Sequence, residues 1–121
     1  MTGLTRYTAV GAVATAAHVL TMVLLVEAAG TAPWLASGLG ALIGAQLAFF
    51  GNRRFTFAHR GALGPAWWRF MGTAVLGAAV GMAVVALAVA AGLQYLLAQA
   101  VASVAVLLLT FAVNRRWTFG G

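Results

Sequence analysis

Residues 93–113 read LQYLLAQAVASVAVLLLTFAV, without one acidic or basic side chain. A helix that crosses about 30 Å of hydrocarbon needs roughly 20 apolar residues, so this stretch predicts a transmembrane helix. Three stretches of the same character precede it, at residues 7–26, 33–51 and 70–91. The sequence therefore predicts an all-α membrane protein, with four transmembrane helices in a single domain over residues 1–121.

The last two predicted spans need a turn between them. A single helix over residues 70–113 would be about 66 Å long at 1.5 Å per residue, about twice the hydrocarbon thickness. Gly92 and Gln94 interrupt the apolar run. We therefore place the turn at these two residues.

The composition excludes a soluble protein. Hydrophobic residues make up 64% of the chain and charged residues only 7%, against about 25% charged residues in a soluble domain. The basic residues are all arginine and are separated by apolar runs, which favours a membrane rather than nucleic acid as the partner of the positive charge. Cysteine is absent, so neither disulfides nor thiolate metal sites are expected.

All the arginines fall on one side of the predicted membrane. One precedes the first span, four lie between the second and third, and two follow the fourth. They are Arg6, Arg53, Arg54, Arg60, Arg69, Arg115 and Arg116. The opposite connections, near Gly30 and Gly92, contain none, so the positive-inside rule predicts that both termini are cytoplasmic. A cleaved signal peptide is the alternative for residues 7–26, although the apolar run is long for one.

The chain contains an internal repeat. LAFFGNRRFTF at residues 47–57 recurs as LTFAVNRRWTF at residues 109–119, with seven of eleven positions identical at an offset of 62. The Ala-Ala-Gly that ends at Gly30 recurs at Gly92 with the same offset. We therefore expect two parallel-repeated helical hairpins, over residues 6–57 and 69–119. Some transporters build a site between such halves.

Each hairpin carries a stripe of small and polar residues along one face of its second span. The stripe on the fourth span comprises Gln99, Ser103, Val106, Thr110 and Asn114. The matching stripe on the second span comprises Ser37, Ala41, Gly44, Ala48 and Asn52. Helix packing alone is an alternative explanation, because small and hydroxyl residues let helices approach closely in lipid.

The paired arginines that end both stripes are the best candidates for a binding site. Guanidinium groups bind phosphate through several donors, and anionic headgroups lie at the depth that these side chains reach. The alternative is that the arginines only anchor the spans on the cytoplasmic side. The candidate lipid-phosphate site comprises Asn52, Arg53, Arg54, Asn114, Arg115, Arg116, Arg6 and Arg69.

His18 lies near the centre of the first span. An ionisable side chain at that depth is costly and indicates a function. The alternative is a neutral histidine that is hydrogen-bonded to a neighbouring helix. Glu27 faces half a turn away from His18 and is either part of a path or a solvated residue at the outer rim. The candidate translocation path comprises His18, Thr15, Gln99, Ser103, Thr110 and Glu27.

Because Glu27 is the only carboxylate side chain, most enzyme chemistry is excluded. Glycosidases need two carboxylates, and magnesium-bound nucleotide sites use them as ligands. The sequence has no phosphate-binding loop with its lysine and no cluster of metal ligands. We therefore expect a protein without catalytic activity, metal or cofactor.

The order of these motifs resembles the GtrA-like family over residues 6–119. The resemblance rests on Arg6-Tyr7, Val10-Gly11, Thr15, His18, Leu24-Leu25 and the two Asn-Arg-Arg-aromatic-Thr-Phe segments that end at Phe57 and Phe119. It implies a protein that binds and translocates polyprenyl-phosphate-linked sugars across the bacterial inner membrane for cell-surface polysaccharide synthesis. The implied partners are polyprenyl phosphate, anionic membrane lipids and a membrane glycosyltransferase.

Two other functions remain open at this point. A small exporter of cationic compounds would need a carboxylate within the membrane, and an anchor subunit for a glycosyltransferase would transport nothing. Four helices leave little room for a sugar, so we also expect a homodimer that packs through small residues such as Gly77 and Gly81.

Overall fold

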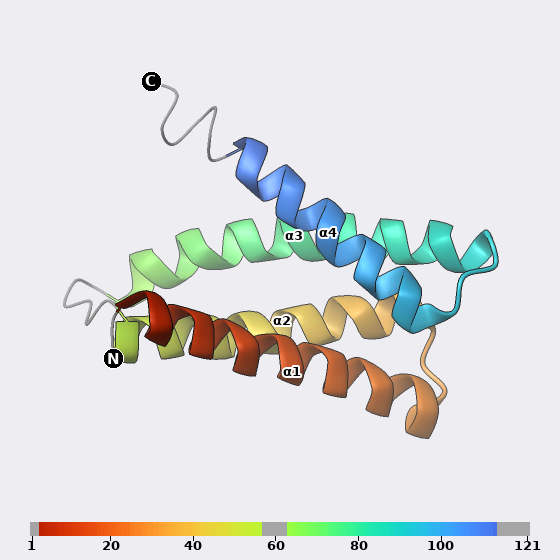
Figure 1. Cartoon of the computed structure of the whole chain (residues 1–121), viewed down its shortest axis with the longest axis horizontal. Helices are drawn as coiled ribbons and strands as arrows, with labels where there is room; N and C mark the ends of the chain where they lie inside the picture. The colour runs from red at the N-terminus through yellow and green to blue at the C-terminus, as the bar shows by residue number, and fades with distance from the viewer. Residues whose placement is uncertain (1–2, 57–62, 114–121) are drawn as a thin grey trace.

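The computed structural model of the chain describes residues 3–56 and 63–113, and four long helices dominate these residues (Figure 1). The elements are α1 (Gly3–Ala29), α2 (Pro33–Gly51), the π-helical turn η1 (Asn52–Thr56), α3 (Leu63–Ala90) and α4 (Tyr95–Val113). Each of the four α-helices contains a stretch long and apolar enough to cross a membrane. The protein is therefore an all-α, multi-pass membrane protein.

The predicted spans correspond to these helices, although three of them have different ends. Only α2 keeps the predicted bounds. α1 extends beyond both ends of residues 7–26, and α4 begins two residues later than predicted. α3 begins at Leu63 rather than at residue 70 and has 28 residues, about 42 Å of helix. Its first turn includes Pro65, which a helix tolerates there because no N–H is needed.

Both connections on the far side from the arginines turn at a glycine with positive φ, 68° at Gly30 and 101° at Gly92. At the second turn the N–H of Leu93 donates to the carbonyl of Ala88 and the N–H of Gly92 to that of Val89, both at 3.0 Å. This is the Schellman arrangement, which satisfies the last carbonyls of a helix. The turn that the sequence predicts at Gly92 is confirmed.

Gln94, the residue before α4, caps this helix. Its Oε1 accepts hydrogen bonds from the N–H groups of Leu96 and Leu97, at 2.9 Å and 3.2 Å. An acceptor in that position satisfies N–H groups of the first helical turn that have no partner within the helix. The polar residue that interrupts the apolar run is therefore the cap of the last span.

The helices pack in chain order, α1 on α2, α2 on α3 and α3 on α4. Glycines on α2 bring α1 very close. A Cβ added at Gly40 would lie 2.6 Å from the carbonyl oxygen of His18, and one added at Gly44 would lie 2.8 Å from that of Ala14. Small residues at a helix interface permit the close backbone approach on which packing in lipid depends.

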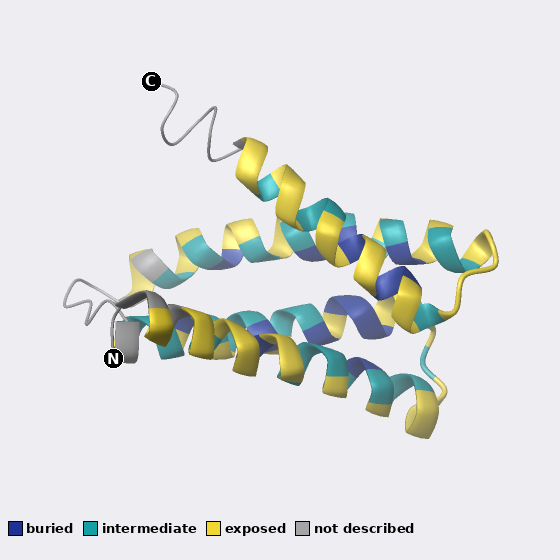
Figure 2. Cartoon of the chain, viewed as in Figure 1, coloured by how far each residue is buried: buried dark blue, intermediate teal, exposed yellow. Residues whose placement is uncertain are grey.

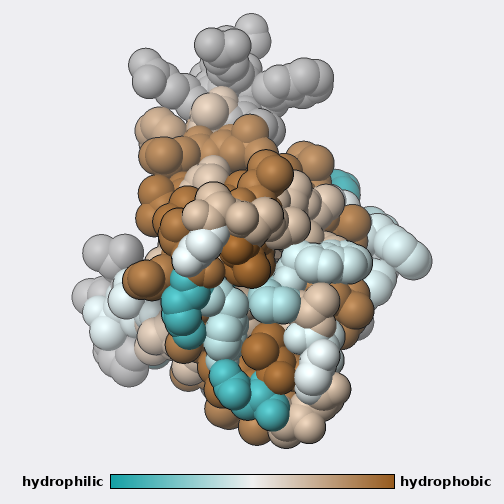
Figure 3. All heavy atoms as spheres, turned by 90° about the vertical axis from the view of Figure 1, so that its right-hand side faces the viewer, coloured by the Kyte–Doolittle hydropathy of each residue, from teal (hydrophilic) through white to brown (hydrophobic). Residues whose placement is uncertain are grey.

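The outward faces of the four helices are exposed, as Figure 2 shows by the yellow segments along each helix, and many of the exposed residues are large and apolar. Leu87 is 72% exposed and Leu107 is 68% exposed. Figure 3 looks onto the end that carries Gly30 and Gly92 and shows a few hydrophilic residues with hydrophobic side chains around them. Such a surface is suited to lipid along the sides and to water at the end.

The buried core lies toward the end of the bundle that carries Gly30 and Gly92, here called the connection end. All four helices contribute to it, through Met22, Ala36, Val85, Ala98 and Ala102. The opposite end carries Arg6, Arg53, Arg54 and Arg69 and is called the arginine end. Toward it α4 diverges from α1 and α2 (Figure 1). The four helices are therefore packed together at the connection end, whereas at the arginine end α4 lies apart from α1 and α2 while α2 stays in contact with α3.

Candidate functional site

A cavity of about 570 Å³ lies between the four helices and is called the central cavity. Its walls are mostly glycine, alanine and other apolar side chains. Its polar lining consists of Thr15, His18, Ser37, Thr73, Gln99, Ser103 and Thr110. Among the residues that the structure describes, neither an arginine nor the glutamate lines this cavity. The described lining therefore offers hydroxyl, amide and imidazole groups without a carboxylate or a guanidinium.

The structure brings five of the six residues of the candidate translocation path to this one cavity. Thr15 and His18 come from α1, whereas Gln99, Ser103 and Thr110 come from α4. The sequence indicates these five residues by their position within the spans, and those of α4 also by a shared helical face. The cavity also receives Thr73 from α3, which the sequence did not single out because it is an isolated polar residue within the apolar span 70–91.

Glu27, the sixth of these residues, does not line the central cavity. It is exposed near the end of α1, where its Oε1 accepts a hydrogen bond of 2.9 Å from the hydroxyl of Tyr95. Because Tyr95 begins α4, this bond joins the first and last helices at the connection end. The structure thus places the carboxylate at the rim.

A hydrogen-bonded chain crosses the closed part of the central cavity. The hydroxyl of Ser37 donates to Oε1 of Gln99 at 2.5 Å, and Nε2 of Gln99 donates to Oγ of Ser103 at 3.0 Å. Ser37 and Gln99 are 2% and 5% exposed. Sequestered polar groups are costly unless paired, so these pairings stabilise the contact between α2 and α4.

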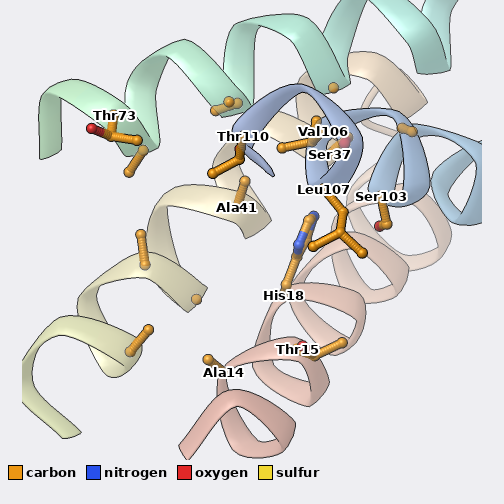
Figure 4. Close-up of a pocket in the computed structure, with 18 of the residues that line it drawn as sticks. Ala14, Thr15, His18, Ser37, Ala41, Thr73, Ser103, Val106, Leu107 and Thr110 are labelled. Atoms are coloured by element: carbon orange, nitrogen blue, oxygen red, sulfur yellow. The ribbon is translucent and has the colours of Figure 1, made fainter. Parts of the chain in front are cut away.

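His18 differs from these three residues, because its Nε2 atom is inaccessible to water and has no hydrogen-bond partner. The close contact between α1 and Gly40 of α2 holds the backbone of His18 in place. In Figure 4 the imidazole extends from α1 into the space beside Leu107 and Ser103 of α4. Both of these residues line the central cavity with it.

A second hollow of about 800 Å³ lies between α1 and α2 toward the arginine end and is called the outer groove. Its lining combines two arginines, one glutamine and apolar residues: Arg6, Ala9, Val10, Val13, Gln46, Leu47, Phe50, Gly51 and Arg54. The α1 residues in this groove differ from those in the central cavity. Leu47 and Phe50 are exposed on the apolar surface of the bundle.

The candidate lipid-phosphate residues are distributed over the arginine end. Arg6 and Arg54 share the outer groove. Arg69 lies on α3 one turn before Thr73, whose hydroxyl donates to the Arg69 carbonyl at 3.4 Å. Asn114, Arg115 and Arg116 lie outside the described residues, so the structure does not bear on their place in the site.

Asn52 and Arg53 belong to η1, a turn that the sequence did not predict. The N–H of Asn52 points to the carbonyls of both Ala48 and Phe49, and the helical path of α2 continues through Thr56 with a wider winding. π-Helical turns within or after α-helices occur frequently at functional sites. The residue types of the Asn-Arg-Arg motif carry no signal for this winding.

A polar contact at the arginine end joins α2 to α3. The indole Nε1 of Trp67 donates to Oε1 of Gln46 at 3.0 Å, and Nε2 of Gln46 lies 2.9 Å from the sulfur of Met71. The rings of Phe49 and Phe70 lie nearby at a tilt of 50°, with centroids 5.3 Å apart. The sequence offered one signal for this contact, an isolated glutamine within an otherwise apolar span.

Gly77 and Gly81, which the sequence suggested as a dimer contact, face α4 of the same chain. A Cβ added at either glycine would meet Val106, at 3.3 Å and 3.7 Å. This small-residue pair therefore packs within the chain, and the predicted dimer contact through it stays a prediction. The same spacing is used within the chain by Gly40 and Gly44 against α1.

Comparison with known proteins yields one match. A family model described as GtrA/DPMS, transmembrane domain, matches residues 6–119. The match covers all four membrane-spanning stretches and both Asn-Arg-Arg segments. No curated protein and no solved structure matches the chain.

Proposed function

The chain belongs to the GtrA-like family, and on this premise we propose that it binds polyprenyl-phosphate-linked sugars and carries their headgroups across the bacterial inner membrane. It acts as a binding and translocating protein rather than as an enzyme. The sugars that it delivers are used for polysaccharide on the cell surface. The family assignment supports a role in lipid-linked sugar processes, and the central cavity supports the steps described below.

The observation that carries this proposal is the polar lining of the central cavity. A sugar that enters hydrocarbon without hydrogen-bond partners loses several kcal/mol for each unpaired group. Thr15, His18, Gln99 and Ser103 supply donors and acceptors at the depth where lipid supplies none. Because α4 diverges toward the arginine end, a headgroup reaches the cavity from that end.

In this proposal the phosphate of the lipid carrier is bound at the arginine end. Arg6 and Arg54 line a groove whose other walls are largely apolar, which suits an anionic headgroup with a hydrocarbon tail. Arg69 lies on α3 one turn before Thr73, which lines the central cavity, and so it lies closer to the arginine end than Thr73 does. The proposed phosphate-binding set also includes Asn52 and Arg53 of the first Asn-Arg-Arg motif. Because the motif is repeated in the sequence, the set includes the second copy as well, from Asn114 to Arg116.

The proposed orientation places the arginine end and both termini in the cytoplasm. We also propose that the two hairpins are parallel repeats. The bounds of α2 shifted by 62 residues coincide with those of α4, and the same shift relates the positive-φ glycines Gly30 and Gly92. Ser37 and Gln99, which bond to one another, are also 62 residues apart.

The proposed partners are anionic lipids, a membrane glycosyltransferase that makes or uses the lipid-linked sugar, and a second copy of the chain. Because Gly77 and Gly81 pack against α4 within the chain, exposed apolar faces such as those bearing Leu87 or Leu107 are further candidates for a dimer interface.

Export of cationic compounds is the alternative that the structure disfavours. A cation within the membrane needs a carboxylate nearby. Glu27, the one carboxylate side chain, lies at the connection end in a hydrogen bond with Tyr95 and does not line the central cavity. The remaining alternative, an anchor for a glycosyltransferase, needs neither the cavity nor a bound lipid.

Native mass spectrometry of the protein released from its own membrane tests the proposed function. We expect retained polyprenyl phosphate with or without sugar, and competition by added polyprenyl phosphate but not by the uncharged polyprenol. The Arg54→Gln variant is expected to retain less. Retention of ordinary phospholipid alone, with no uptake of added polyprenyl phosphate, would refute the proposal and leave the anchor function.

A further inference from the structure

We infer that His18, with the Ser37–Gln99–Ser103 chain beside it, forms a subsite for the hydroxyl groups of an uncharged headgroup and that His18 is its specificity-determining residue. This inference rests on the proposed function and assigns a place and a chemistry to the headgroup. It starts from the one buried side-chain nitrogen or oxygen that lacks a partner in the part of the chain described by the structure, Nε2 of His18.

The unpaired nitrogen is costly in the unliganded protein. A buried polar atom without a hydrogen bond has lost its hydration and gained no partner in exchange. The neighbouring polar groups do not relieve this cost, because Ser37, Gln99 and Ser103 bond among themselves. A ligand group that bonds to His18 removes the penalty and gains binding energy from it.

The chemistry of the missing partner follows from the surroundings. Within residues 3–56 and 63–113, the lining of the central cavity includes no arginine to neutralise an anion and no carboxylate to neutralise a cation. A neutral imidazole has one nitrogen that donates and one that accepts, and a hydroxyl group pairs with either. The subsite therefore suits a headgroup with several hydroxyl groups and no charge, and it disfavours an amino sugar or a sugar acid.

The ligand reaches Nε2 by a small local movement, since this atom is shielded from water in the unliganded structure. The imidazole turns about two side-chain bonds, and the central cavity offers space beside it. Leu107, which extends beside His18 in Figure 4, is itself 68% exposed and lies on α4, whose main packing partner is α3. Movement of this leucine therefore leaves the packing of α1 on α2 intact.

The experiment compares the affinities of two lipids, a polyprenyl phosphate and the same lipid carrying a neutral hexose, for the purified protein in nanodiscs. Tryptophan fluorescence serves as the signal. The variants are His18→Ala and His18→Gln, because glutamine keeps a donor and an acceptor. The matched control is Thr21→Ala, a polar residue of the same helix that does not line the central cavity.

We expect the parent and Thr21→Ala to bind the hexose lipid more tightly than the phosphate lipid. His18→Ala should reduce this preference by roughly two- to tenfold, the effect of one hydrogen bond, and leave the affinity for the phosphate lipid unchanged. His18→Gln should retain part of the preference. Unchanged affinity for the phosphate lipid also shows that each variant is folded.

Three results would overturn the inference, and they are distinguishable. If the preference for the hexose lipid persists in both His18 variants, His18 is not the recognition residue although the proposed function stands. If the parent binds neither lipid, the proposed function fails and the subsite fails with it. A lipid with a uronic acid headgroup that binds as tightly as the hexose lipid would also contradict the uncharged character of the subsite.

Discussion

Replacing Gly40 by alanine tests the contact that positions His18. The added Cβ would lie 2.6 Å from the His18 carbonyl oxygen and 2.8 Å from its Cδ2 atom, whereas ordinary contacts begin at 3.4 Å. The backbone of α1 must therefore move by up to about 0.8 Å at this crossing. A rigid shift of that size also disturbs the contact between Gly44 and Ala14, which is nearly as close.

The expected cost follows from these distances. Overpacking of a close contact costs about 1–3 kcal/mol, whereas Gly→Ala within a helix gains up to about 1 kcal/mol in propensity. Gly72→Ala is the matched control, because Gly72 lies within α3 and a Cβ there meets nothing within 4 Å. The difference in stability between the two variants therefore isolates the packing cost, about 1–3 kcal/mol.

Unfolding by sodium dodecyl sulfate in mixed micelles, followed by the fluorescence of the four tryptophans, measures this difference. We expect Gly40→Ala to unfold at a lower detergent fraction than Gly72→Ala and also to lose preference for the hexose lipid, because His18 moves with α1. If Gly40→Ala is as stable as Gly72→Ala, the described approach of α1 to α2 is incorrect.

Three further predictions concern the phosphate, the orientation and the contact between α2 and α4. Arg54→Lys keeps the positive charge but loses the planar guanidinium, so the affinity for polyprenyl phosphate should fall about tenfold while membrane insertion stays normal. A binding titration measures this affinity, and equal affinities for the parent and the variant would leave Arg54 as an anchor only. A cysteine at Ala32 should react with an impermeant reagent in intact cells whereas one at Gly64 should not, and the reverse pattern would invert the proposed topology. Gln99→Leu should destabilise the protein by about 0.6 kcal/mol, the average for a hydrogen bond between membrane helices, and by no more than about 1.7 kcal/mol. An unchanged unfolding curve would show that the bond to Ser37 contributes nothing to stability.

The four spans were predictable from hydropathy. The connection between the last two spans was predictable from the residues at its turn. The bounds of α2 follow from the length of its apolar run. The turn at Gly92 follows from the glycine itself and from the glutamine after it, which caps α4. It was also predictable that Gln99, Ser103 and Thr110 lie together, here in the wall of the central cavity. Residues at helical spacing share one face of a helix, and this does not depend on what the face contacts.

The pairing of helices was not predictable in the same way. Gly40 and Gly44 have the same spacing as Gly77 and Gly81, and the sequence does not say whether such a pair meets a neighbour in the same chain or in another. Likewise Glu27 finds its partner in Tyr95, which is 68 residues away, so the position of Glu27 within its own helix gave no indication of this contact. The winding of η1, which contacts α1 and α2, had no local signal in the sequence either.

Transfer of a headgroup across the bilayer is the most direct test of the central claim. Purified protein would be reconstituted into vesicles whose outer leaflet carries a polyprenyl-phosphate-linked hexose with a radiolabel, and an enzyme enclosed in the vesicles would oxidise hexose that reaches the inner leaflet. We expect the parent protein and Thr21→Ala to accelerate this oxidation and His18→Ala to slow it towards the rate of vesicles without protein. Free polyprenyl phosphate should compete with the labelled lipid. Oxidation at the same rate with and without the parent protein, under conditions in which it binds the lipid, would contradict translocation.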